Sequence, residues 1–290
     1  MSISLLLGAL LSASTPMGMD SGGRPTLALH INGQGPFQMV VDTAAQTSLL
    51  SPRLVQKLQL QPLDEQMTVR GAVGAQSASI YPIEELRSGL FHEQQLGMLA
   101  LPSGDATSAD GIIGMERFTE GKLVFRPAQG ELALLPSGPV GAGHVAVAGE
   151  RDESGLLHVP MQMGSATVMA LVDTGAGPTV ANLQTLDAMG WSRDDPRLQA
   201  AGAIRGATAE MTPAWIAQVD AVKIGPVSFR NVPVVFADTG PAPSPAVILG
   251  ANLLGLLQGF AVDFPRAELQ VAVPGHGVAA TDVATPGAGH

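Results

Sequence analysis

An aspartate followed by a threonine ends an apolar run twice in this chain of 290 residues. Residues 39–45 read MVVDTAA and residues 170–176 read ALVDTGA, so the two motifs centre on Asp42 and Asp173. The offset between these aspartates also relates Gly33 to Gly164, Val40 to Leu171 and Ser51 to Asn182. Two long copies fit a pair of lobes related by a pseudo-two-fold axis better than an array of short repeats.

The repeat continues beyond the motif with small changes in spacing. Gly71, in the sequence VRG, corresponds to Gly206, in IRG, at a slightly larger offset. Gly114, in GIIG, corresponds to Gly250, in VILG, at an offset that is slightly larger again. Short loop insertions in the second half explain this drift, so the chain is predicted to be an internal duplication.

A third Asp-Thr-Gly sequence begins at Asp238 and provides an internal control. The sequence PAPSP follows it at residues 241–245, which indicates a loop rich in turns. The motifs at Asp42 and Asp173 instead lead into apolar segments, at Leu49 and Val180. We therefore predict that Asp238 is an ordinary loop residue and that the other two aspartates form the site.

Short apolar or alternating runs separated by turn residues predict one hairpin in each half. The predicted strands are residues 26–31, 37–41, 157–163 and 167–172. Residues 51–58 and 182–190 each begin with a helix-capping residue, Ser51 or Asn182, and predict short helices. Because the remaining segments are short, rich in Val, Ile, Leu and Thr, and broken by Gly or Pro, the predicted fold class is mainly β.

Other chemistries lack the residues that they need. The chain has no cysteine, and its six histidines form no His-Glu-x-x-His motif. No Gly-x-Ser-x-Gly sequence precedes a helix, and a formal net charge of −10 does not attract nucleic acid. We expect no metal, no cofactor and no nucleic-acid partner. A glycosidase with two carboxylates stays conceivable, although its acids need not lie in a duplicated frame.

Two carboxylates brought face to face can share one proton and activate water at moderate pH. Each half of the chain resembles a lobe of the retropepsin-like aspartic proteases, and the fused pair resembles a compact bacterial relative of pepsin. The resemblance spans residues 26–273 and is close at residues 172–180 and 248–250. It implies a mainly β fold with two similar, pseudo-symmetric lobes and short helices.

The resemblance also implies roles for the residues of the two motifs. Asp42 and Asp173 are the expected catalytic pair of an aspartic endopeptidase, a hydrolase that acts on peptides or proteins. Thr43 and Thr174 are expected to bond across the axis to the opposite loop. Because both lobes lie in one chain, the protein is expected to be active as a monomer.

Ala44 departs from the family pattern, which has glycine at this position, as at Gly175. If the turn requires a positive φ, alanine costs about 1–2 kcal/mol relative to glycine. The backbone N–H remains available to hold the aspartate. The alternative function is therefore a catalytically impaired, protease-like protein that binds peptides or serves as a scaffold.

Ala45 and Ala176 stand where pepsin-like enzymes usually carry a hydroxyl group that donates to the ionised aspartate. Loss of that donor destabilises the charged form, so the pair should lose its second proton at higher pH. We therefore expect a mildly acidic to near-neutral pH optimum.

Two glycine-bearing segments match the flaps of the family, which close over a bound peptide. The candidate substrate-binding residues in these segments are Gly71, Ala72, Val73, Gly206 and Ala207.

The domain organisation predicted from the sequence has five parts. Residues 1–25 are a possible signal or leader, because residues 3–13 form an apolar stretch that is too short to span a membrane stably. The lobes are residues 26–136 and 156–274, joined by a linker at residues 137–155, and residues 275–290 form a disordered tail. The leader predicts a periplasmic or secreted protein; the alternative is a cytoplasmic one.

Overall fold

The computed structural model describes residues 12–71, 74–101, 107–205, 211–239, 244–273 and 281–282. Within this part of the chain most of the regular structure is β-strand, arranged as two similar barrels and a sheet that both halves share. The predicted fold class is confirmed.

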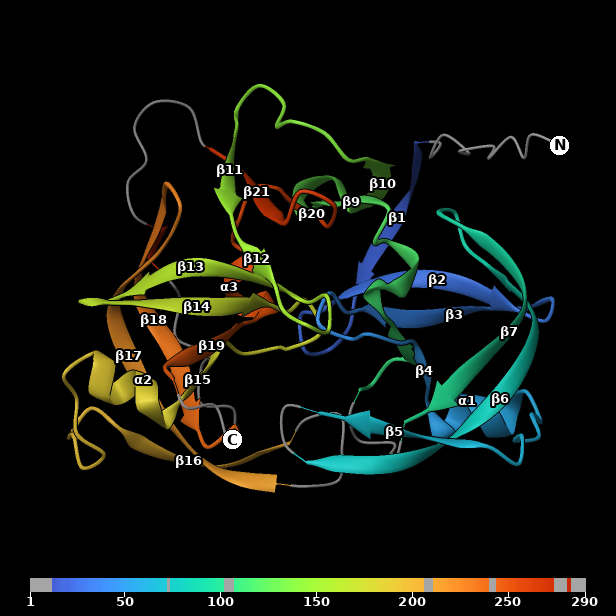
Figure 1. Cartoon of the computed structure of the whole chain (residues 1–290), viewed down its shortest axis with the longest axis horizontal. Coiled ribbons are helices and arrows are strands. Elements are labelled where there is room, and N and C mark those ends of the chain that lie inside the picture. The colour runs from blue at the N-terminus through green and yellow to red at the C-terminus, as the bar shows by residue number, and fades with distance from the viewer. Residues whose placement is uncertain are drawn as a thin grey trace, which may run out of the picture.

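Six strands form the barrel of the N-terminal lobe, shown in blue to green in Figure 1. They are β2 (Pro25–Ile31), β3 (Gln34–Val41), β8 (Gly111–Ile113), β4 (Leu49–Leu50), β7 (His92–Ala100) and β6 (Ala75–Arg87). The barrel closes because β6 pairs back onto β2. A seventh strand, β5 (Gln66–Arg70), pairs with β6 and makes a hairpin that extends from the barrel.

The C-terminal lobe repeats this barrel strand for strand. Its strands are β13 (Leu157–Met163), β14 (Ala166–Val172), β19 (Ala246–Leu249), β15 (Val180–Asn182), β18 (Val227–Ala237) and β17 (Met211–Ile224). It closes through the pairing of β13 with β17, and β16 (Gln199–Arg205) extends β17 into the second hairpin. The parallel pairs β3–β8 and β14–β19 correspond, as do the parallel pairs β4–β7 and β15–β18.

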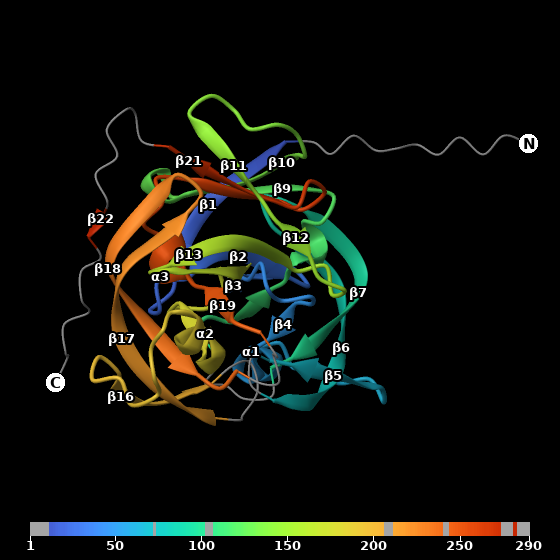
Figure 2. The same ribbon diagram turned by 60° about the vertical axis from the view of Figure 1, so that its left-hand side comes forward.

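A six-stranded sheet joins the lobes and lies above both barrels in Figures 1 and 2. Its order is β11 (His144–Ala148), β21 (Glu268–Ala272), β20 (Phe260–Asp263), β9 (Gly121–Arg126), β10 (Glu131–Pro136) and β1 (Ala13–Met19). The central pair, β9 with β20, brings one strand from each half together. The hairpin strands β5 and β16 lie on the opposite side of the molecule in both views.

The outer strands of this sheet extend the repeat beyond the predicted lobes. Ala13 of β1 pairs with Leu134, and its repeat counterpart, His144 of β11, pairs with Ala272 in the same way. The part of the predicted leader from Ala13 onward therefore belongs to the folded lobe, because β1 is hydrogen-bonded to both β10 and β2.

Strands also occur in the segments predicted as linker and tail. The linker segment contributes β11 and β12 (Glu150–Arg151), which pairs with β13. In the tail segment, β22 (Thr281–Asp282) pairs with β18.

The short helices confirm the capping signals. Helix α1 (Pro52–Lys57) begins after Ser51, whose hydroxyl accepts the amide of Leu54 at 3.1 Å. Helix α2 (Leu183–Ala188) begins after Asn182, which caps it in the same way. Three further short turns follow barrel or sheet strands: η2 (Met115–Arg117), η3 (Pro127–Gln129) and α3 (Ala251–Leu254).

One continuous apolar core joins the barrels to the shared sheet. It includes Leu29 and Leu50 of the first barrel, Val159 of the second, and Leu123 and Val262 from the central strands of the sheet, all fully buried. A shared core of this kind holds the two lobes together. No helix among the described residues is both long and apolar enough to cross a membrane.

Candidate active site

Corresponding strand ends position the two aspartates. Strand β3 ends one residue before Asp42, whose amide donates to the carbonyl of Ile113 in β8 at 2.9 Å. Strand β14 ends one residue before Asp173, whose amide donates to the carbonyl of Leu249 in β19 at 3.1 Å. The parallel pair β3–β8 thus fixes the backbone at Asp42, and the equivalent pair β14–β19 fixes it at Asp173.

The two threonines lock these loops together across the axis. The hydroxyl of Thr43 donates to the carbonyl of Val172 at 2.7 Å, and the hydroxyl of Thr174 donates to the carbonyl of Val41 at 2.6 Å. Each hydroxyl also accepts the amide of the opposite threonine, at 3.2 and 3.1 Å. Both side chains are only 1% exposed, so water does not compete with this reciprocal network.

Asp42 and Asp173 face each other at the centre of the network, and the charge of Asp42 acts on the carboxyl group of Asp173. Oδ1 of Asp42 accepts the amide of Ala44 at 2.8 Å. Oδ1 of Asp173 accepts the amides of Gly175 and Ala176, both at 2.8 Å. Each carboxyl is half-buried, and backbone donors in its own loop orient it.

Ala44 and Gly175 occupy equivalent positions in the two loops, and the left-handed backbone that would penalise alanine is present at neither. Neither residue has a positive φ, so Ala44 carries no left-handed strain. The close approach of Asp42 explains the glycine, since a Cβ at position 175 would lie 2.1 Å from Oδ2 of Asp42. The second loop has no room for a methyl group, whereas the first loop accepts one.

Burial raises the pKa of both carboxyl groups above its ordinary value. The charge of Asp42 raises the pKa of Asp173 further, to well above its usual range. The amides of Ala44 and Ala45 oppose the rise in the pKa of Asp42, and the positive charge of Arg24 also opposes it. Two carboxyl groups this close cannot both ionise easily, so the pair retains one proton at moderate pH.

Arg24 is a neighbour of the pair that the sequence did not indicate. Its Nη1 donates to the carbonyl of Gly175 at 3.3 Å, and its Nη2 donates to the hydroxyl of Thr107 at 3.1 Å. It also forms an ion pair with Asp20 at 2.5 Å, in which the side chains are 15% and 3% exposed. Arg24 lies in the segment predicted as a leader, so nothing in the sequence indicated that its side chain would lie beside the aspartate pair.

A second pair of side chains supports the loops from behind. The hydroxyl of Ser48 donates to Glu116 at 2.6 Å and accepts the amide of Gly114 at 3.0 Å. In the C-terminal lobe, Thr179 donates to Asn252 at 2.7 Å. Its hydroxyl accepts the amide of Gly250 at 3.2 Å. The repeat spacing relates these residues, so aligning the two halves would have revealed them.

The repeated glycines of the Ile/Leu-Gly element lie directly against the aspartate loops. A Cβ at Gly114 would come within 2.7 Å of the carbonyl oxygen of Ala45, and one at Gly250 within 2.3 Å of that of Pro178. Such distances leave no space for a side chain. Glycine at these positions lets η2 and α3 begin immediately behind the loops.

The first predicted flap segment lies on the hairpin of β5 and β6, and the second follows the end of β16. The amide of Gly71 bonds to the carbonyl of Gly74 at 3.1 Å and closes the first tip. Ala72 and Val73 fall outside the described residues, and so do Gly206 and Ala207 of the second hairpin.

Small apolar clusters connect each hairpin to its barrel. Val69 of the first hairpin packs in a buried cluster with Leu49 and Ile112. Ile204 of the second packs against the cluster that contains Val180. The first cluster includes Val40 of β3 itself, and the second packs against Ile248 of β19, which pairs with β14.

The third Asp-Thr-Gly motif begins in an exposed loop. Asp238 follows the end of β18 and is exposed, in a loop outside the barrel ladders. Among the described residues, no three His, Asp or Glu side chains gather in a way that could hold a metal ion.

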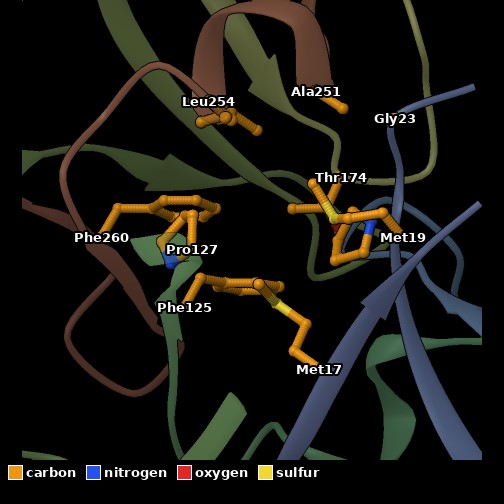
Figure 3. A pocket seen from close by; sticks show the side chains of 11 residues that line it. Met17, Met19, Gly23, Phe125, Pro127, Thr174, Ala251, Leu254 and Phe260 are labelled. Atoms are coloured by element: carbon orange, nitrogen blue, oxygen red, sulfur yellow. The ribbon is translucent and has the colours of Figure 1, made fainter. Parts of the chain in front are cut away.

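A small apolar hollow lies where the shared sheet meets the loop of Thr174 (Figure 3). Phe125 and Phe260 stack in it with ring centroids 4.5 Å apart, next to Met17 and Leu254. None of the residues that line it is titratable, so it contributes apolar surface rather than acid–base chemistry.

Comparison with known proteins identifies the family. No curated protein matches the chain. A family model described as aspartyl protease matches residues 27–117 and 159–253, which together make up more than half of the sequence. The two matched segments contain the two aspartate loops and the barrels that carry them. The chain belongs to the aspartyl protease family.

Proposed function

We propose that the protein is an aspartic endopeptidase, which hydrolyses peptide bonds with a water molecule activated between Asp42 and Asp173. The observation that carries this proposal is the reciprocal threonine network, which sets the loops of two half-buried carboxyl groups against each other. A structural ion-pair site would bring opposite charges together. Two acidic groups that share one proton are instead suited to acid–base chemistry.

The reaction needs one ionised and one protonated carboxyl group. The ionised group takes a proton from water, whose oxygen bonds to the scissile carbonyl carbon, while the protonated group gives its proton to the carbonyl oxygen. In the second step the first group gives its proton to the leaving nitrogen, and the C–N bond breaks. The second group recovers a proton from a hydroxyl of the intermediate. The pair thus returns to its starting state without a covalent adduct.

The two hairpins supply the rest of the proposed substrate site. An extended peptide would lie between the aspartate loops and the hairpins β5–β6 and β16–β17, which are anchored on each barrel. Because one chain provides both loops, we propose that a monomer is active. Export to the periplasm or to the outside of the cell is proposed from the apolar sequence at residues 3–13.

The decisive experiment compares three asparagine variants on an unfolded protein substrate. Asp42→Asn and Asp173→Asn should each lower kcat by at least about 10³-fold, because each removes one of the two acid–base groups. Asp238→Asn is the matched control, since it changes the same tripeptide in an exposed loop. Equal activity in all four proteins would refute the assignment.

The alternative is a protein that binds peptides without cleaving them, although Ala44, the residue that departs from the family pattern, carries no left-handed strain. Binding of a statine-type transition-state mimic separates the two. If the protein is an enzyme, it binds the mimic and cleaves members of a broad peptide library. If it only binds peptides, the wild type and Asp42→Asn bind them equally well and neither cleaves any.

A further inference from the structure

The turn that precedes each barrel has the same backbone hydrogen bonds in both halves. Oδ1 of Asp20 accepts the amides of Gly22 and Arg24, both at 2.9 Å. In the second half, Oδ1 of Asp152 accepts the amides of Ser154 and Leu156, at 2.8 and 3.0 Å.

The turns close in the same way as well. The amide of Asp20 bonds to the carbonyl of Arg24, and the amide of Asp152 bonds to that of Leu156. Residue 24 of the first half therefore corresponds to residue 156 of the second. The first is a cation and the second is an apolar side chain packed against the core.

At this position only the first turn carries an arginine, whereas the aspartate of the second turn pairs with His158 at 3.1 Å. Arg24 crosses from the turn of the N-terminal lobe and donates to the carbonyl of Gly175. The carboxylate of Asp42 packs against this same Gly175, closer than a Cβ would permit. Arg24 thus holds the peptide unit on which Asp42 rests, and its charge favours the ionised form of Asp42.

We propose that Arg24 is a positioning residue that fixes the negative charge of the pair on Asp42. Asp42 is then the group that takes the proton from water, and Asp173 is the group that protonates the substrate carbonyl. This assignment of roles rests on the proposed hydrolysis, whereas the location of the charge is a property of the protein alone.

The other charged groups around the site are balanced by partners. Behind Ser48, Arg117 pairs with both Glu116 and Glu93. In the second-half turn, Asp152 pairs with His158 at 3.1 Å. Asp20 neutralises part of the charge of Arg24 across the 2.5 Å ion pair. Removal of Asp20 should therefore strengthen the field of Arg24 at Asp42, and removal of Arg24 should abolish it.

These opposite effects define the test. The acid limb of the pH profile of kcat/KM reports the ionisation of the base in the free enzyme. Arg24→Gln should move its midpoint up by about 0.5–1 pH unit, because loss of a cation raises the pKa of Asp42. Arg24→Lys should keep the midpoint near that of the wild type. Asp20→Asn retains an oxygen that can accept the two turn amides, and it should move the midpoint down.

A purely structural role predicts a different pattern. If Arg24 only supports the turn, Arg24→Gln, Arg24→Lys and Asp20→Asn lower kcat while the midpoint of the acid limb stays fixed. That result would overturn the proposal. If Arg24→Gln does not fold, the direction of the Asp20→Asn shift alone decides between the two roles.

A carboxyl ¹³C NMR titration of aspartate-labelled protein, with Asp42→Asn to assign the signal, measures the same shifts without substrate. A wild type that cleaves nothing would count against the proposed function. The NMR titration would still support the charge assignment, or overturn it if Arg24→Gln left the Asp42 signal unmoved.

Discussion

The loops around Asp42 and Asp173 are alike in backbone and different in side chains. Both follow a parallel strand pair, both receive the opposite threonine, and both rest on a glycine of the Ile/Leu-Gly element. Around this frame the first lobe has Ala44, and the second has Gly175. Duplication preserved the geometry that both aspartates need, while residues that act on only one of them diverged.

Among the differences between the two loops, the largest effect is expected from exchanging the residues at the equivalent positions 44 and 175. Gly175→Ala should lower kcat by about 10²-fold or more, because its Cβ would meet the carboxylate of Asp42 and displace it. Ala44→Gly should change kcat only a few-fold, because Ala44 already has an unstrained φ. Steady-state kinetics on one peptide measures both. Equal losses in the two variants would show that the loops tolerate side chains in the same way.

The cross-axis threonines should instead respond symmetrically. Thr43→Val and Thr174→Val each remove a hydroxyl that donates to one buried carbonyl and accepts one buried amide. Leaving such groups unpaired should cost about 2–4 kcal/mol of the free energy of unfolding in either lobe. Urea denaturation measures this cost. A much smaller loss for one variant would show that its loop finds other partners.

Much of this symmetry was predictable from sequence because it repeats. Asp42, Asp173 and both threonines lie at a fixed spacing after apolar strands, and two similar capping residues begin α1 and α2. A pattern present twice is hard to produce by chance. The mainly β architecture followed from the same pairs of short runs.

The features that escaped prediction either occur once or look like something else. The strand β1 has the sequence ASTPMGM, whose small residues follow an apolar stretch and therefore resemble the end of a leader. Its partners, β10 and β2, are identified only by the folded sheet.

The position equivalent to Arg24 holds Leu156, so the repeat could not mark the arginine. The sequences DSGGR at residues 20–24 and DESGL at residues 152–156 share an aspartate and a glycine at matching positions. They could have indicated equivalent turns. The sequence could not show that the guanidinium reaches the carbonyl of Gly175, because this contact depends on how the lobes pack.

Serine in place of Ala45 or Ala176 should lower the pKa of the neighbouring carboxyl group. Ala45→Ser and Ala176→Ser each add a hydroxyl near one carboxyl, and donation to the charged form would lower its pKa. Activity that requires an ionised carboxylate would then persist to lower pH, with the acid limb shifted down by up to about 1 pH unit. The pH dependence of kcat/KM measures the shift in each lobe. A shift toward neutral pH in both variants would contradict the expected near-neutral optimum of the parent protein.

The smallest predicted difference lies behind the loops, where Glu116 supports Ser48 and Asn252 supports Thr179. Glu116→Gln keeps an amide oxygen that can accept from Ser48, but it removes the charge that pairs with Arg117. Asn252→Asp makes the reciprocal change, adding a charge where the second lobe has none. Because Glu116 is partly exposed and the buried Arg117 keeps its second ion-pair partner, Glu93, Glu116→Gln should cost only about 0.5–1 kcal/mol of the free energy of unfolding. Asn252→Asp should cost more, because the Asn252 side chain accepts from the neutral Thr179 hydroxyl rather than from a cation. Urea denaturation of the two variants measures both losses. A larger loss for Glu116→Gln than for Asn252→Asp would contradict this order and show that the first lobe depends more on its charged support than the second depends on its neutral one.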